Sequence, residues 1–209
     1  MIYFIGTIYK GKSFLSKIVS FVAKRNGHKL PFTHSAILLK YQGEWKVLEI
    51  TTKGFQEHSL NDYIRDYEGE IYFGTFTKIK FTQELADRLY GFFQEDKNDP
   101  LINKYDYMGA GNSFKFKTQP WAFLLNNTLG KYLNYKDKKT QGTFCSELAF
   151  KLGLSVIYTV PNVDFSSKEM DFFSKNKLRT TTDFKKIYPA MMSDVFCMQP
   201  INHLNKCDK

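Results

Sequence analysis

Two spacings of apolar residues recur along this chain, one typical of strands and one typical of helices. The apolar run at residues 2–9 predicts a first strand. Residues 13–25 instead show helical spacing, with Ser13 placed to cap the helix. Leu15, Ile18, Val19 and Val22 follow the spacing of one apolar helix face, and the other face carries Lys12, Lys17, Lys24 and Arg25. The pattern indicates a helix packed on a sheet, although a helix lying on a membrane surface would show it too.

Further strands and helices follow in a regular order. Residues 32–40 and 45–51 predict two strands joined as a hairpin through the turn Tyr-Gln-Gly-Glu. The remaining predicted elements are a short strand after Gly54, a short helix over 60–66, a strand over 70–81, a helix over 82–95 with Thr82 as its cap, and a helix over 144–152 closed by Gly153. The last 50 residues predict loops and short helices.

A single domain over residues 1–209 accommodates these elements, because a chain of this length can bury a sizeable core. Hydrophobic residues make up 43% of the chain and charged residues 24%, the proportions of an ordinary soluble globular protein. The pattern weakens after residue 97. We therefore expect an insertion at about 107–143 and a C-terminal extension from about 155.

The chain is basic, with a net charge of +9 and a pI of about 9.3. This charge permits attraction to nucleic acid, anionic lipid or anionic cell-wall polymers. No basic block is longer than two residues and no RNP-like motif occurs, so specific nucleic-acid binding is not expected. Neither a signal peptide nor an 18-residue apolar stretch is visible. A cytoplasmic protein is the default expectation, and a protein of viral or phage origin would look the same.

The segment Gly-Thr-Phe-Cys-Ser-Glu at 142–147 sets Cys145 between a turn and the predicted start of a helix. The other cysteines are Cys197 and Cys207, and the absence of a CxxC pair argues against a disulfide framework or a zinc knuckle. The free N–H groups of a helix N-terminus stabilise a thiolate and can hold an oxyanion. A buried structural cysteine is the simpler interpretation unless a base lies nearby.

Four histidines could supply that base. His203 lies in a polar tail, His28 in a polar turn and His58 in a predicted edge segment. His34 differs because it lies near the start of an apolar strand, where a polar side chain is unusual and suggests a functional role. His34 is therefore the candidate base.

The register of the hairpin predicts a third polar residue. If residues 42–43 form a two-residue turn, Glu49 faces Ala36 on the neighbouring strand. Side chains alternate between the two faces of a strand, so His34, Ala36 and Glu49 share one face. Glu49 is then a diagonal neighbour of His34, roughly 7 Å away at the backbone and within side-chain reach. A carboxylate there would orient the imidazole and stabilise the imidazolium.

Four short motifs follow one another along the first 155 residues. They are Thr-His-Ser-Ala-Ile-Leu-Leu at 33–39, the Glu-bearing strand at 47–60, Lys-Tyr-Asp-Tyr-Met-Gly at 104–109 and Thr-Phe-Cys-Ser-Glu-Leu at 143–148. In this order the chain resembles the circularly permuted branch of the NlpC-type papain-like cysteine peptidase superfamily, which has bacterial lipoprotein-associated and poxvirus members. The tail at 180–189 resembles that family more weakly. The permuted lecithin-retinol acyltransferases carry Asn-Cys-Glu-His, whereas this chain has Phe-Cys-Ser-Glu, which favours the peptidase and amidase branch.

The resemblance implies an α+β, papain-like fold in which helices pack on an antiparallel sheet and the catalytic cysteine lies at a helix N-terminus. It implies a thiol hydrolase that cleaves an amide or ester through an acyl-enzyme. Carried over to this chain, the triad is Cys145 as nucleophile, His34 as base and Glu49 as the third polar residue. Tyr105 and Asp106 match the family's Tyr-Asp pair, and we expect them to be structural or to line the site.

Two further features concern the surroundings of this triad. The insertion departs from the family pattern and would either form a substrate pocket or lid with Trp121, Phe123 and Tyr132, or cover a site that has changed use. Glu147 stands two residues after Cys145, which turns it away from the thiol on a helix and predicts a structural hydrogen bond.

Other function classes fit the same residues. An acyltransferase or lipase is favoured if the insertion and the Phe-rich surface form an apolar channel. A third possibility is a non-catalytic binding protein that has the hydrolase scaffold without its activity. The presence of a nucleophile, a base and an orienting carboxylate favours the hydrolase. We expect a peptide, cell-wall or lipid-like substrate carrying an amide or ester, and no cofactor. No HExxH motif and no cluster of His and Asp occurs, so no metal is expected.

Overall fold

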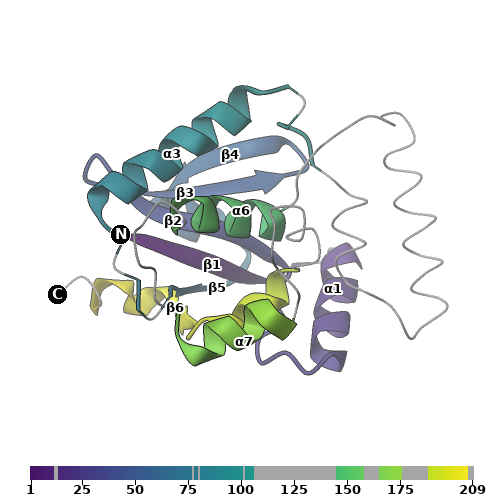
Figure 1. The fold of residues 1–209 in the computed structure, drawn as a ribbon. Coiled ribbons are helices and arrows are strands. Elements are labelled where there is room, and N and C mark those ends of the chain that lie inside the picture. The colour runs from purple at the N-terminus through teal and green to yellow at the C-terminus, as the bar shows by residue number, and fades with distance from the viewer. Residues whose placement is uncertain are drawn as a thin grey trace.

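The computed structural model describes residues 1–11, 14–76, 78–79, 81–100, 102–105, 145–157, 165–175 and 188–206. These residues form a six-stranded antiparallel sheet with helices packed against it (Figure 1). The strand order is β4-β3-β2-β1-β5-β6. The predicted α+β class with an antiparallel sheet is confirmed.

The elements follow the predicted order closely through the first hundred residues. The strands are β1 (Ile2–Tyr9), β2 (His34–Tyr41), β3 (Glu44–Thr51), β4 (Gly54–Ser59), β5 (Gly69–Gly74) and β6 (Gln199–Pro200). The α-helices are α1 (Phe14–Arg25), α2 (Leu60–Asp66), α3 (Gln83–Asn98), α6 (Cys145–Ile157), α7 (Ser167–Lys175) and α8 (Met192–Val195). Two 3₁₀ helices, η2 (Pro189–Met191) and η3 (Ile201–Lys206), complete the C-terminal part.

The sheet is buried on both faces because separate hydrophobic clusters cover them. In Figure 1, α3, α6 and α7 lie across the front of the sheet. The front cluster takes Phe4 and Leu48 from the sheet and Phe150 from α6. The rear cluster takes Ile5 and Val47 from the same strands, together with residues of α2 and η3. Because β1 and β3 bury neighbouring residues on opposite faces, the register of the sheet is firmly specified.

The β2–β3 hairpin has the predicted turn and register. Gln42 and Gly43 both have positive φ, at 50° and 86°, which is the geometry of a two-residue turn of type I′. The strands pair from Tyr41 opposite Glu44 to Ile37 opposite Leu48. This register brings the first residue of β2 and the sixth residue of β3 to the same end of the sheet.

The predicted ends of β5 and α6 are wrong, and both elements pack closely against other parts of the chain near those ends. The strand predicted over 70–81 ends at Gly74, where the chain lies against the C-terminal segment: a Cβ on Gly74 would lie 2.6 Å from the Met198 sulfur. The helix predicted to close at Gly153 continues to Ile157. A Cβ on Gly153 would overlap the ring of Phe4, so this glycine permits close approach of α6 to the sheet.

Several sequence predictions fall outside the described residues. They are the insertion at about 107–143, including Trp121, Phe123 and Tyr132, and also Ser13, Asp106 and Cys207.

Candidate active site

Cys145 is the first residue of α6 and is buried, with 4% of its surface exposed. Its sulfur lies 3.9 Å from the hydroxyl of Tyr105. Burial raises the pKa of the thiol, but the charge and hydrogen bond of His34, together with the adjoining Ser35, outweigh burial and lower it from 9.0. The N-terminus of α6 adds to this effect, because helix N–H groups favour a negative charge there. The site thus favours a thiolate.

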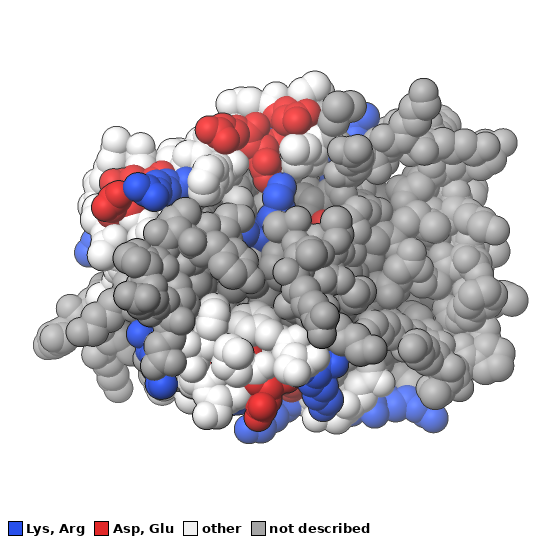
Figure 2. All heavy atoms as spheres, in the orientation of Figure 1, with Lys and Arg blue, Asp and Glu red and all other residues white. Residues whose placement is uncertain are grey.

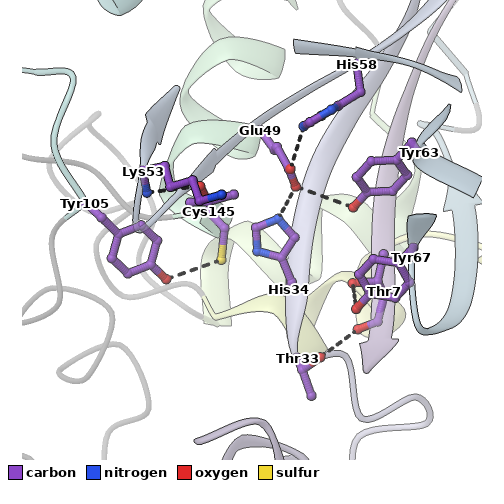
Figure 3. A network of polar contacts seen from close by, with 11 residues as sticks. Thr7, Thr33, His34, Glu49, Lys53, His58, Tyr63, Tyr67, Tyr105 and Cys145 are labelled. Atoms are coloured by element: carbon purple, nitrogen blue, oxygen red, sulfur yellow. Dashed lines mark hydrogen bonds and ion pairs between the residues drawn. The ribbon is translucent and has the colours of Figure 1, made fainter. Parts of the chain in front are cut away.

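His34 lies between the thiol and the carboxylate of Glu49. It is the first residue of β2, and its Nε2 lies 2.6 Å from Glu49 Oε2. Figure 3 shows the other ring nitrogen on the side of the Cys145 sulfur. Burial lowers the pKa of His34, but the charge and hydrogen bond of Cys145 and those of Glu49 together raise it to about 10. The surroundings of His34 therefore favour its imidazolium form.

Glu49 is a buried carboxylate with three donors. Besides the contact with His34, its Oε1 lies 3.1 Å from Nε2 of His58, and its Oε2 accepts from the Tyr63 hydroxyl at 3.4 Å. Burial raises the pKa of Glu49, but the hydrogen bonds from His34 and His58 outweigh burial and lower it to about 2. Glu49 consequently stays ionised across the range in which proteins function.

The sequence pattern predicted the pairing of His34 with Glu49 but not the other two donors. His58 lies on β4, where Gln56 pairs with Glu49, so that His58 is again a diagonal neighbour. The signal was present, because Thr52-Lys53 joins β3 to β4 as a second two-residue turn, and counting from it places His58 on the same face. β4 is an edge strand as predicted, yet its histidine turns inward to Glu49.

Tyr63 comes from α2 and could not be placed by strand counting. It is buried, and burial followed by the charge of Glu49 raises the pKa of its hydroxyl well above 10.0. It therefore remains a donor to Glu49. The Ser59 hydroxyl caps α2 by accepting from the Asp62 N–H, which fixes the helix and with it Tyr63.

Ser35 lies near the thiol and is a further residue that sequence reasoning missed. Its side chain is fully buried, and both its side chain and its backbone lower the pKa of Cys145. Alternation along β2 turns Ser35 to the opposite face from His34, which is the face that α6 covers. His34 and Ser35 therefore both lie near the thiol, although their side chains are on opposite faces of β2.

Of the other predicted site residues, Tyr105 lies against the thiol, and Asp106 and Trp121 lie outside the described residues. Glu147 is buried in the first turn of α6.

His28 is not part of this site: its Nδ1 lies 2.8 Å from Asp194 Oδ2, and its Nε2 contacts the Tyr188 hydroxyl. That contact joins the turn after α1 to the C-terminal segment.

The described ranges contain no group of three or more His, Cys, Asp or Glu side chains arranged to hold a metal ion. Within the same ranges, none of the helices combines the length and the apolar character needed to cross a bilayer.

Comparisons with known proteins give only distant structural likenesses. No protein-family model matches this chain, and no curated protein matches it. The crystal structure of the metalloprotein YiiX from Escherichia coli O157:H7 is similar over 90% of this chain and 83% of its own, with a TM-score of 0.47 and 15% sequence identity.

Proposed function

We propose that this protein is a thiol hydrolase of the permuted NlpC-type papain-like class, which cleaves an amide or ester through an acyl-enzyme. One observation carries the proposal: a buried cysteine at a helix N-terminus faces a histidine whose far nitrogen is bound by a buried carboxylate. This is the nucleophile–base–orienter arrangement of thiol catalysis. The order of the histidine strand, the Glu-bearing strand and the cysteine helix supports the same class.

The first half-reaction begins from the ion pair of Cys145 and His34. The thiolate attacks the carbonyl carbon, a carbon–sulfur bond forms, and the carbonyl electron pair moves to the oxygen. The N–H groups at the start of α6 stabilise this oxyanion. The oxyanion then collapses, the bond to the leaving nitrogen or oxygen breaks, and the imidazolium gives its proton to the leaving group. A thioester on Cys145 and a neutral imidazole remain.

The second half-reaction returns the enzyme to its starting state. The neutral imidazole of His34 takes a proton from water as the water oxygen adds to the thioester carbonyl. The new oxyanion collapses, the carbon–sulfur bond breaks, and Cys145 leaves as a thiolate beside the imidazolium. Glu49 holds the ring through both steps, since its fixed charge stabilises the imidazolium each time it forms.

The acyl acceptor distinguishes this hydrolase from an acyltransferase. Water as acceptor releases a free acid, whereas an alcohol or amine as acceptor would yield a new ester or amide. Turnover of amide and ester substrates with and without added alcohol or amine, followed by mass spectrometry of the products, separates the two reactions. We expect the free acid to dominate.

The proposal is tested by labelling the folded protein with limiting iodoacetamide from pH 4 to 9 and mapping the labelled peptides. Cys197 is exposed and serves as an internal reference in the same molecule. We expect Cys145 to react faster than Cys197 at neutral pH in spite of its burial, because only the thiolate is nucleophilic. Equal or slower labelling of Cys145 would contradict an activated thiolate and with it the hydrolase.

A further inference from the structure

The positive charge of this chain is concentrated at its beginning. Residues 1–43 contain no Asp or Glu, and the first acidic residue is Glu44. The same residues contain seven basic side chains, which are Lys10, Lys12, Lys17, Lys24, Arg25, Lys29 and Lys40. This segment supplies most of the net charge of +9. Most of these residues lie on α1 or within a few positions of its ends.

One face of α1 is exposed and combines these cations with an aromatic ring. Lys17, Phe21, Lys24 and Arg25 are exposed, and Phe21 shows 52% of its surface. At about 100° per residue, these four positions fall within about 100° of arc around the helix. Ala23 lies on the opposite side and is fully buried in the front cluster. The helix is therefore held by one side and presents the other outward. Figure 2 shows basic side chains at the lower right of the molecule, where α1 ends in Figure 1.

We propose that this α1 surface (Lys17, Phe21, Lys24 and Arg25) docks the protein on an anionic lipid membrane. A half-exposed phenylalanine surrounded by cations suits the boundary between lipid headgroups and acyl chains. The ring enters the apolar layer, while Lys and Arg extend to the phosphates. The absence of acidic residues on α1 leaves no charge that would repel an anionic headgroup. This inference does not depend on the thiol chemistry.

The shape of the surface favours a membrane over a single-stranded nucleic acid. Nucleic-acid grooves align several aromatic rings so that successive bases stack on them. The described part of α1 presents a single exposed ring, Phe21, on a convex helix. A helix with one apolar anchor and a basic border instead fits a flat charged surface.

Co-sedimentation with vesicles tests the proposal. We expect the protein to bind vesicles of phosphatidylglycerol mixed with phosphatidylcholine, and to bind pure phosphatidylcholine vesicles far less. The double variant Lys24→Gln/Arg25→Gln should lower the partition coefficient about fivefold for each charge removed. Phe21→Ser should lower the partition coefficient about fivefold as well, because serine has no apolar ring to transfer from water into the membrane. Thermal unfolding of both variants should match the parent, since all three side chains are exposed.

Phe92→Ser is the matched control. Phe92 is also an exposed phenylalanine on a helix, at 37%, but α3 carries several acidic residues. We expect this variant to bind vesicles like the parent. Equal binding to the two vesicle types, or unchanged binding by the Phe21 and Lys24/Arg25 variants, would overturn the proposal. Tighter binding to a single-stranded oligonucleotide than to the anionic vesicles would overturn it too, and would assign the α1 surface to nucleic acid.

Discussion

His58 Nε2 lies 3.1 Å from Glu49 Oε1, whereas His34 Nε2 lies 2.6 Å from the other oxygen of the same carboxylate (Figure 3). One buried Glu49 therefore joins histidines from β2 and β4. The hydrogen bond to Glu49 is the main cause that raises the pKa of His58, and the charges of Glu49, Asp62 and Asp66 add to it. With both oxygens engaged, the carboxylate cannot rotate without losing a donor, so His58 fixes the group that fixes His34.

His58→Leu should lower kcat about tenfold if the hydrolase is correct, because Glu49 loses the donor that holds Oε1. His58→Gln should stay within about threefold of the parent, since its amide can still donate at that position. Steady-state kinetics with one chromogenic ester would measure both effects.

Gln56→Leu is the control for the His58 variants. Gln56 lies directly opposite Glu49 on β4, but its amide donates to backbone carbonyls, at 3.0 Å to that of Phe55. We expect Gln56→Leu to have the same kcat as the parent. Equal losses in His58→Gln and His58→Leu would show that the charge of His58 matters rather than its hydrogen bond.

Cys145→Ala should reduce turnover by at least about 10⁴-fold, because the proposed hydrolase uses this thiolate as its nucleophile. The change is small and should alter the free energy of unfolding by less than about 1 kcal/mol. Cys197→Ala, at an exposed position, should change neither quantity. Turnover that persists in Cys145→Ala after removal of contaminating enzymes would exclude Cys145 as nucleophile.

The pH dependence of turnover should be bell-shaped. The thiolate forms as pH rises through the lowered pKa of Cys145, below 9.0, and the imidazolium is lost as pH passes about 10. Because the Cys145 thiolate is the largest cause that raises the pKa of His34, Cys145→Ser should lower that pKa. NMR titration of the His34 ring in both proteins would measure the difference. An identical His34 pKa in both would show that the two groups are not paired.

Glu49→Gln should lower kcat about 10²-fold and His34→Ala about 10⁴-fold, because the orienting residue takes no proton itself. Both variants should fold. The comparison requires kcat and KM for the same substrate. Equal losses in the two variants would mean that Glu49 does more than orient the imidazole.

Glu49 should also make the free energy of unfolding depend on pH. Its pKa is about 2 in the folded protein against 4.5 ordinarily, which favours folding by about 3 kcal/mol when the group is ionised. A lowered pKa contributes stability that is present above pH 4.5 and is lost as pH falls toward 2. The free energy of unfolding should therefore differ between the parent and Glu49→Gln at pH 6, and the gap should shrink as pH falls. Urea unfolding at several pH values would follow it, and a constant gap would contradict the assigned pKa.

Much of the geometry of the candidate site could be predicted from local pattern. The alternation along residues 32–51 and the Gln-Gly turn determine the hairpin register, because a slip by one residue would turn Glu49 to the other face. That register alone places Glu49 beside His34. The apolar spacing after Cys145 likewise predicts a helix that begins at the thiol.

Other features depend on parts of the chain that meet only after folding. β5 ends at Gly74, against the segment around Met198, and α6 continues through Gly153, where the ring of Phe4 lies close to the helix backbone. No local pattern near these glycines contains that information. Propensity therefore placed the ends of both elements wrongly.

The sequence by itself determined which residues share a strand face and which cysteine begins a helix, since these follow from the periods of strand and helix. Only the tertiary structure decided that Cys145 faces His34, that Ser35 and Tyr105 adjoin the thiol, and that Tyr63 binds Glu49. The physical reason is that these contacts join β2, α2, α6 and the segment at Tyr105, whose relative positions are set by packing of the two hydrophobic clusters on the sheet.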